Sequence, residues 1–158
     1  MRRLAIVLTA ATVYAAQEPG FKTRPANPTP PTQTAGAIHD LSRMLPSKGL
    51  KHSGIVMDQV FGISKLPGGT VGDYESGGKK YRIFIIDARA NQDAAFMLLD
   101  AKSALKNPEY LASFGGYFGQ NGTEPVFVFA KQRYLAGIGG LPKDQADPLA
   151  RTLASKLQ

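Results

Sequence analysis

Two histidines are the first residues of this chain whose type could support catalysis. His39 and His52 are the only histidines, so a serine–histidine–acid site would have to use one of them, for example His52 with its neighbour Ser53. No Gly-x-Ser-x-Gly motif is present to expose a nucleophilic serine on a strand-to-helix turn. We therefore expect both histidines at the surface or at an interface rather than in a catalytic site.

A metal site would have to combine His39, Asp40 and His52, and these lack the i, i+4 or short-loop spacing typical of such sites. The chain has no cysteine. This excludes cysteine-ligated zinc, thiolate catalysis, a disulfide framework and acylation of a lipoprotein cysteine. We expect no metal and no cofactor.

The carboxylates Asp73 and Glu75 have two possible interpretations, an acid–base pair or two cross-strand charge pairs. Asp73 and Glu75 lie two residues apart on a predicted strand and so share one face, where paired carboxylates can divide acid and base roles. Lys80 and Arg82 follow on the next predicted strand and would form cross-strand charge pairs with them. We prefer the charge pairs. A small extracytoplasmic hydrolase or ligand-binding enzyme using Asp73, Glu75 and His52 is the alternative.

Residues 108–122 are rich in aromatic residues and glycine, which predicts a loop. Its rings could stack on a ligand or partner, or they could cap the core. Two further phenylalanines lie on the predicted strand that follows. The candidate binding residues are Tyr110, Phe114, Tyr117, Phe118, Phe127 and Phe129.

The elements that would position these residues centre on residues 81–106. Tyr81–Asp87 carries apolar side chains on both sides, which indicates an interior strand. From Ala94 the apolar residues recur at helical spacing, and we expect a helix capped by Asn91. Phe96 and Leu99 widen its apolar stripe, so we expect this helix to lie flat on a sheet.

The remaining periodicity predicts a short helix at residues 37–45 and a last helix capped by Asp147 with Pro148 at its first position. Strands are predicted at residues 53–62, 70–75, 126–130 and 133–138, and residues 76–79 should form a tight hairpin turn. Two strand–strand–helix units result. They predict an α+β domain, an antiparallel sheet of about five strands with helices packed mainly on one face. The other face would then be apolar and without a helix over it, and it would expose either Phe127 and Phe129 or Val126 and Val128.

The N-terminus has the pattern of an export signal. Arg2 and Arg3 precede the apolar run Leu4–Tyr14, and small residues at 13–15 suit signal peptidase. We expect a signal peptide at residues 1–15, a Pro-rich linker at 16–36 and the domain at 37–158, with an uncleaved anchor as the alternative. The protein would then be periplasmic or secreted, without an integral membrane span after cleavage.

Charge does not identify a partner. The chain carries 19 Lys+Arg and 12 Asp+Glu, a formal charge of +7, but no basic run concentrates it. Export and the apolar strand faces argue against nucleic-acid binding.

Three short motifs carry a resemblance: Ile86-Asp87 followed by Asp93–Phe96, the hairpin Lys131–Tyr134, and Leu149–Ala154. Over about residues 45–157 the chain resembles a group of uncharacterised exported bacterial proteins, filed as domains of unknown function. The resemblance implies an extracytoplasmic location and a compact α+β fold, and it implies no known activity.

These observations together favour a non-catalytic binding or interaction domain. We expect it to form a homodimer or bind a protein partner through the open apolar sheet face and the aromatic, glycine-rich segment.

Overall fold

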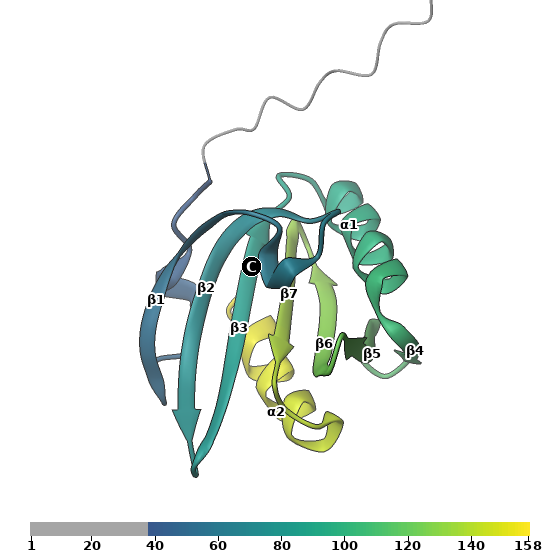
Figure 1. Cartoon of the computed structure of the whole chain (residues 1–158). Helices are drawn as coiled ribbons and strands as arrows, with labels where there is room; N and C mark the ends of the chain where they lie inside the picture. The colour runs from purple at the N-terminus through teal and green to yellow at the C-terminus, as the bar shows by residue number, and fades with distance from the viewer. Residues whose placement is uncertain (1–37) are drawn as a thin grey trace, which may run out of the picture. The chain divides into compact units, whose positions relative to one another are not determined.

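Seven strands form one antiparallel sheet in the computed structural model, which describes residues 38–158. The strand order is β1-β2-β3-β7-β6-β5-β4 (Figure 1). The α+β class and the antiparallel sheet are confirmed, and the expected count of about five strands is wrong. The predicted signal peptide and Pro-rich linker lie outside the described residues. The strands are β1 Leu50–Asp58, β2 Pro67–Ser76, β3 Lys79–Asp87, β4 Lys106–Leu111, β5 Gly116–Asn121, β6 Glu124–Lys131 and β7 Tyr134–Gly139.

The two strands beyond the expected set come from residues 108–122, which form a hairpin and not a loop. Tyr117 and Phe118 of β5 lie opposite Val128 and Phe127 of β6, so their alternation is that of a strand. Glycines between the rings obscured this pattern. They have a packing reason, because a Cβ on Gly119 would lie 3.0 Å from the Leu105 Cβ atom.

The two helices cover opposite faces of the sheet, so the expectation that they share one face is wrong. α1 (Asn91–Ala104) packs with Phe84, Ile86, Val126 and Val128, together with the short 3-10 helix η2 (Val60–Gly62). α2 (Lys143–Ala154) covers the other face, together with the 3-10 helix η1 (Ser42–Met44). Because the central strands alternate apolar residues on both sides, each face needs its own cover. The residues buried beneath α2 include Ile83, Ile85, Phe127, Phe129 and Ile138.

The helices differ from expectation at their ends and on their outer surfaces. α1 follows Ala90 without a side-chain cap, and Asn91 is its first residue. Its buried contacts use the small Ala94 and Ala101, whereas Phe96 and Leu99 are exposed and do not lie on the sheet. Met97 and Leu98 are partly buried on the same side as these alanines, whereas Phe96 and Leu99 lie on the opposite side of the helix.

The last helix begins at Lys143, four residues before the predicted cap Asp147. The N–H groups of Gln145 and Ala146 donate to the Pro142 carbonyl and start the helix there. Pro148 therefore lies inside the helix, where it cannot donate to the preceding turn.

The predicted first helix and first strand have other bounds in the structure: within the described residues the helix at 37–45 is reduced to η1, and the strand at 53–62 begins earlier, at Leu50, and ends earlier, at Asp58. Asp40 accepts the N–H of Ser42, which lowers the pKa of that carboxyl and limits the helix to η1. β1 ends at Asp58 because Gln59 and Phe61 adopt left-handed backbone conformations. This turn inserts Phe61 against Phe84, with ring centroids 4.7 Å apart.

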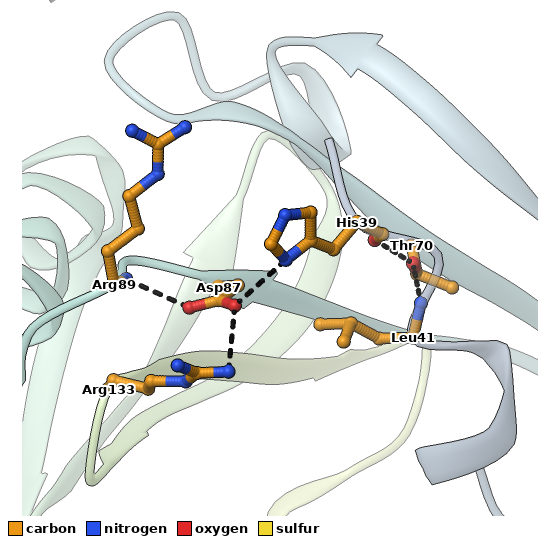
Figure 2. A network of polar contacts seen from close by, with 6 residues as sticks. All are labelled: His39, Leu41, Thr70, Asp87, Arg89 and Arg133. Carbon is orange, nitrogen blue, oxygen red and sulfur yellow. Dashed lines mark hydrogen bonds and ion pairs between the residues drawn. The ribbon is translucent and has the colours of Figure 1, made fainter. Parts of the chain in front are cut away.

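The segment before η1 is fastened to the sheet by two polar contacts at Thr70 (Figure 2). The Thr70 hydroxyl accepts the Leu41 N–H at 2.9 Å and donates to the His39 carbonyl at 3.3 Å. Asp87 lies beside this contact and accepts the Arg89 N–H at 2.9 Å. Its other oxygen lies 3.2 Å from Arg133 Nη2 and 3.4 Å from His39 Nδ1. These contacts hold residues 39–41 against β2 and β3.

Neither helix in residues 38–158 combines the length and apolar character needed to cross a bilayer.

Removing the Thr70 hydroxyl should destabilise the domain. Thr70 is fully buried, and Thr70→Val keeps its shape but leaves the Leu41 N–H and His39 carbonyl without their partner. We expect the free energy of unfolding to fall by about 1–3 kcal/mol, measured by urea denaturation. Thr152→Val on the exposed face of α2 is the control and should change it by less than about 0.5 kcal/mol. Equal effects at both sites would contradict the fastening role.

Gly137 of β7 should not tolerate a side chain. A Cβ there would lie 2.4 Å from Phe84 Cε1 and 2.9 Å from the Phe127 carbonyl oxygen. Gly137→Ala should therefore cost about 1–3 kcal/mol of unfolding free energy, measured by denaturation. Gly54→Ala in β1 is the matched control, because its Cβ would meet only His52 Nε2, at 3.6 Å. A neutral Gly137→Ala would show that the central strands are not closely packed there.

Candidate functional site

The apolar sheet face predicted as the binding surface is not open. Phe127 and Phe129 are buried beneath α2, and Val126 and Val128 are buried on the α1 side. The expectation failed because it assigned both helices to one face. Phe127 and Phe129 are core residues of this domain and cannot contact a partner without displacing α2.

Two of the four predicted aromatic residues in the β4–β5 hairpin also belong to the core. Phe114 packs edge-on against Phe127 and Phe129, with ring centroids 5.4 and 4.8 Å apart. The guanidinium of Arg151 lies 5.3 Å from the Phe114 ring centroid. Phe118 is partly buried in the same cluster. These two rings close the end of the core under α2.

The other two aromatic residues lie on the α1 side of the hairpin. Tyr117 is partly buried, with Lys102 Nζ 5.0 Å from its ring centroid. Tyr110 packs at 5.3 Å from Tyr117 and is 56% exposed. Of the six predicted binding residues, Tyr110 alone offers most of its surface to a partner.

The candidate acid–base pair lies in a charged groove of about 470 Å³ at the β2–β3 hairpin. Within it, Asp73 lies directly opposite Arg82 and Glu75 opposite Lys80. Arg82 Nη2 forms an ion pair with Glu124 at 2.6 Å. Each acid therefore has a basic residue opposite it in the register, but within residues 38–158 no ion pair joins Asp73 to Arg82 or Glu75 to Lys80, and Arg82 pairs with Glu124 instead.

His52 does not complete an enzyme site in this groove. It lies opposite Asp73 in the β1–β2 register, but it does not line the groove. Within residues 38–158, no hydrogen bond or ion pair joins His52 to either acid. A catalytic group has to reach the group it activates, and nothing here favours the hydrolase alternative.

His39 does have an acidic partner, in the contact with Asp87 described above. Asp87 is shared with Arg133, whose pKa is raised first by the neighbouring Tyr134 and then by Asp87 itself. In the described part of the chain, no hydroxyl hydrogen-bonds to the His39 imidazole. The pair fastens the N-terminal segment and activates no nucleophile. Residues 38–158 contain no group of three or more His, Asp or Glu placed to hold a metal ion.

A surface that the sequence did not indicate lies at the β1 edge of the sheet. β1 pairs only with β2, and Figure 1 shows it at the edge far from α1. Three consecutive apolar side chains are exposed on it: Ile55 by 43%, Val56 by 38% and Met57 by 76%. Ile55 and Met57 point to one face and Val56 to the other. An edge strand also presents unpaired backbone N–H and C=O groups.

The opposite edge, β4, carries the features that prevent strand pairing. It has six residues, including Lys106 and Pro108, and its register shifts between Lys106 and Glu109. Lysine, proline and bulges are common ways of protecting an edge. Glu109 is also held by an ion pair with Lys143 of α2.

β1 is protected only at its beginning. Its register shifts between Leu50 and His52, near Lys51, and from His52 to Asp58 the pairing with β2 is regular. Residues 53–57 contain neither proline nor charge. The absence of these protecting residues was the one signal of an accessible edge in the sequence. This signal did not predict an edge from the sequence alone, because the position of the strand in the sheet was unknown.

Comparison with protein-family models, with curated proteins and with solved structures finds no match for this chain.

Proposed function

We propose that this domain is a non-catalytic interaction module that binds an extended polypeptide segment by adding a strand to β1. The observation that carries the proposal is the exposed run Ile55–Met57 on the regular part of an edge strand, where residues 53–57 contain neither proline nor charge. Strand addition of this kind obtains affinity from main-chain hydrogen bonds and specificity from alternate side chains.

The surface also indicates the chemistry of the bound segment. Because β1 exposes apolar side chains on both faces, an added strand gains most if it carries apolar residues on both of its own faces. Burying such surface contributes about 25 cal/mol per Å². Proline would remove a backbone donor, so the segment should lack it between its ends. If residues 1–15 act as an export signal, this partner is itself an extracytoplasmic protein.

The proposal predicts that a strand-forming peptide binds at β1. The probe is an isotope-edited NMR titration with a capped peptide that has consecutive valine and isoleucine residues at its centre and a charged residue at each end. We expect shift changes centred on residues 52–58, slower amide exchange there, and no binding of the same peptide with a central proline. Ile55→Lys should weaken binding by about tenfold or more, because it places a charge on the edge.

Tyr110→Lys is the matched control, since it adds the same charge at an exposed position on the opposite edge. It should leave peptide affinity unchanged, and thermal melting should show both variants folded. Equal peptide affinity for Ile55→Lys and the unmodified chain, or shift changes centred elsewhere, would refute the strand-addition proposal.

A further inference from the structure

We infer that the strand bound at β1 is β1 of a second copy of this chain, paired antiparallel across a twofold axis at Ile55. This inference rests on the proposed function and specifies its partner. It follows from the order of side chains along residues 52–58.

A twofold axis perpendicular to the sheet restricts the pairing. Opposite residues of an antiparallel pair point to the same face, so the axis has to pass through a residue that faces its own copy. With Ile55 at the axis, Val56 lies opposite Gly54 of the second copy, Met57 opposite Ser53, and Asp58 opposite His52. Each large apolar residue beside the axis then faces a small one, and the two end residues can form a carboxylate–imidazole contact.

Neighbouring registers lack this complementarity. An axis at Gly54 would bring Asp58 opposite Leu50 and Met57 opposite Lys51, where the β1 register is irregular. An axis at Val56 would pair only residues 54–58 and would place Asp58 opposite Gly54. The Ile55 register uses the whole regular part of β1 and avoids the bulge.

Gly54 provides a second observation. Glycine weakens a strand interior and commonly marks a close approach of another group. Gly137 and Gly69 are explained in this way within the chain, since a Cβ at either would lie under 3.0 Å from a neighbouring atom. A Cβ on Gly54 would have no neighbour that close, and the only atom within 4 Å of it would be His52 Nε2, at 3.6 Å. In the inferred dimer, Val56 of the second copy lies opposite Gly54, where the His52 side chain of the same strand is the one neighbour and no backbone atom blocks the approach.

Cysteine crosslinking tests the register, because the chain has no cysteine of its own. Directly opposite Cα atoms of an antiparallel pair are about 4.5–5.5 Å apart, within the range for a disulfide. Ile55→Cys in the full chain should therefore form a covalent dimer under mild oxidation. Met57→Cys alone should not, since its own copy would lie ~13 Å away along the strand. Ser53→Cys combined with Met57→Cys should crosslink again.

Tyr110→Cys is the control for random collision, because Tyr110 is more exposed than Ile55. It should remain uncrosslinked under the same conditions. Crosslinking of Gly54→Cys in preference to Ile55→Cys would overturn the register, and equal crosslinking at Tyr110 and Ile55 would overturn the inferred interface.

Sedimentation equilibrium of the full chain tests the association itself. We expect a reversible dimer. Its dissociation constant should rise about three- to tenfold in Asp58→Lys, because at each end of the interface this substitution places a lysine opposite His52 of the other copy. The double variant His52→Glu/Asp58→Lys inverts the pair and should restore the dimer. Failure of that rescue would argue against the pairing of residues 52 and 58.

The same preparation separates this inference from the proposed function. A chain that stays monomeric at the highest soluble concentration, yet binds the strand peptide at β1, overturns the second copy as partner and leaves strand addition standing. A monomer that binds no peptide overturns both.

Discussion

The structure depends on a central group of strands that is apolar on both sides. In β3, Ile83 and Ile85 point to one face and Phe84 and Ile86 to the other, and all four are buried. β6 repeats the pattern with two phenylalanines and two valines. Such strands are stable only between two layers of cover. With two α-helices in the described domain, one has to go to each face, and the 3-10 helices η1 and η2 extend that cover toward β2.

This requirement explains where the cover ends. α1 packs on β5, β6 and β7, α2 packs on β6 and β7, and η1 and η2 pack on β2. None of the helices in residues 38–158 packs to a comparable extent on β1, the strand beyond them, and Ile55, Val56 and Met57 stay exposed. The candidate interaction surface is thus a consequence of how the core is completed. It lies at the edge of the sheet because both α-helices pack on the central strands.

The charged residues mainly have structural roles. Asp87 fastens the segment that enters the domain, Glu124 and Arg82 join the ends of β6 and β3, and Glu109 ties β4 to α2. Burial also raises the pKa of Tyr74 and Tyr81, which line the charged groove. These arrangements stabilise elements and bring no nucleophile to a base. The proposed interaction role therefore rests on the exposed edge strand β1 and not on these charged contacts.

Local patterns in the sequence determined the two-faced strand at Tyr81–Asp87, the helix that follows it, and the Gly77-Gly78 hairpin turn, whose positive φ angles glycine adopts readily. They did not determine strand order, the face that each helix covers, or which apolar strand lies at the edge. Ile55–Met57 and Ile83–Ile86 look alike in sequence, yet the first is exposed and the second buried. Periodicity records which sides of a strand are apolar, whereas exposure depends on neighbours distant in the chain. Only the tertiary structure decided that.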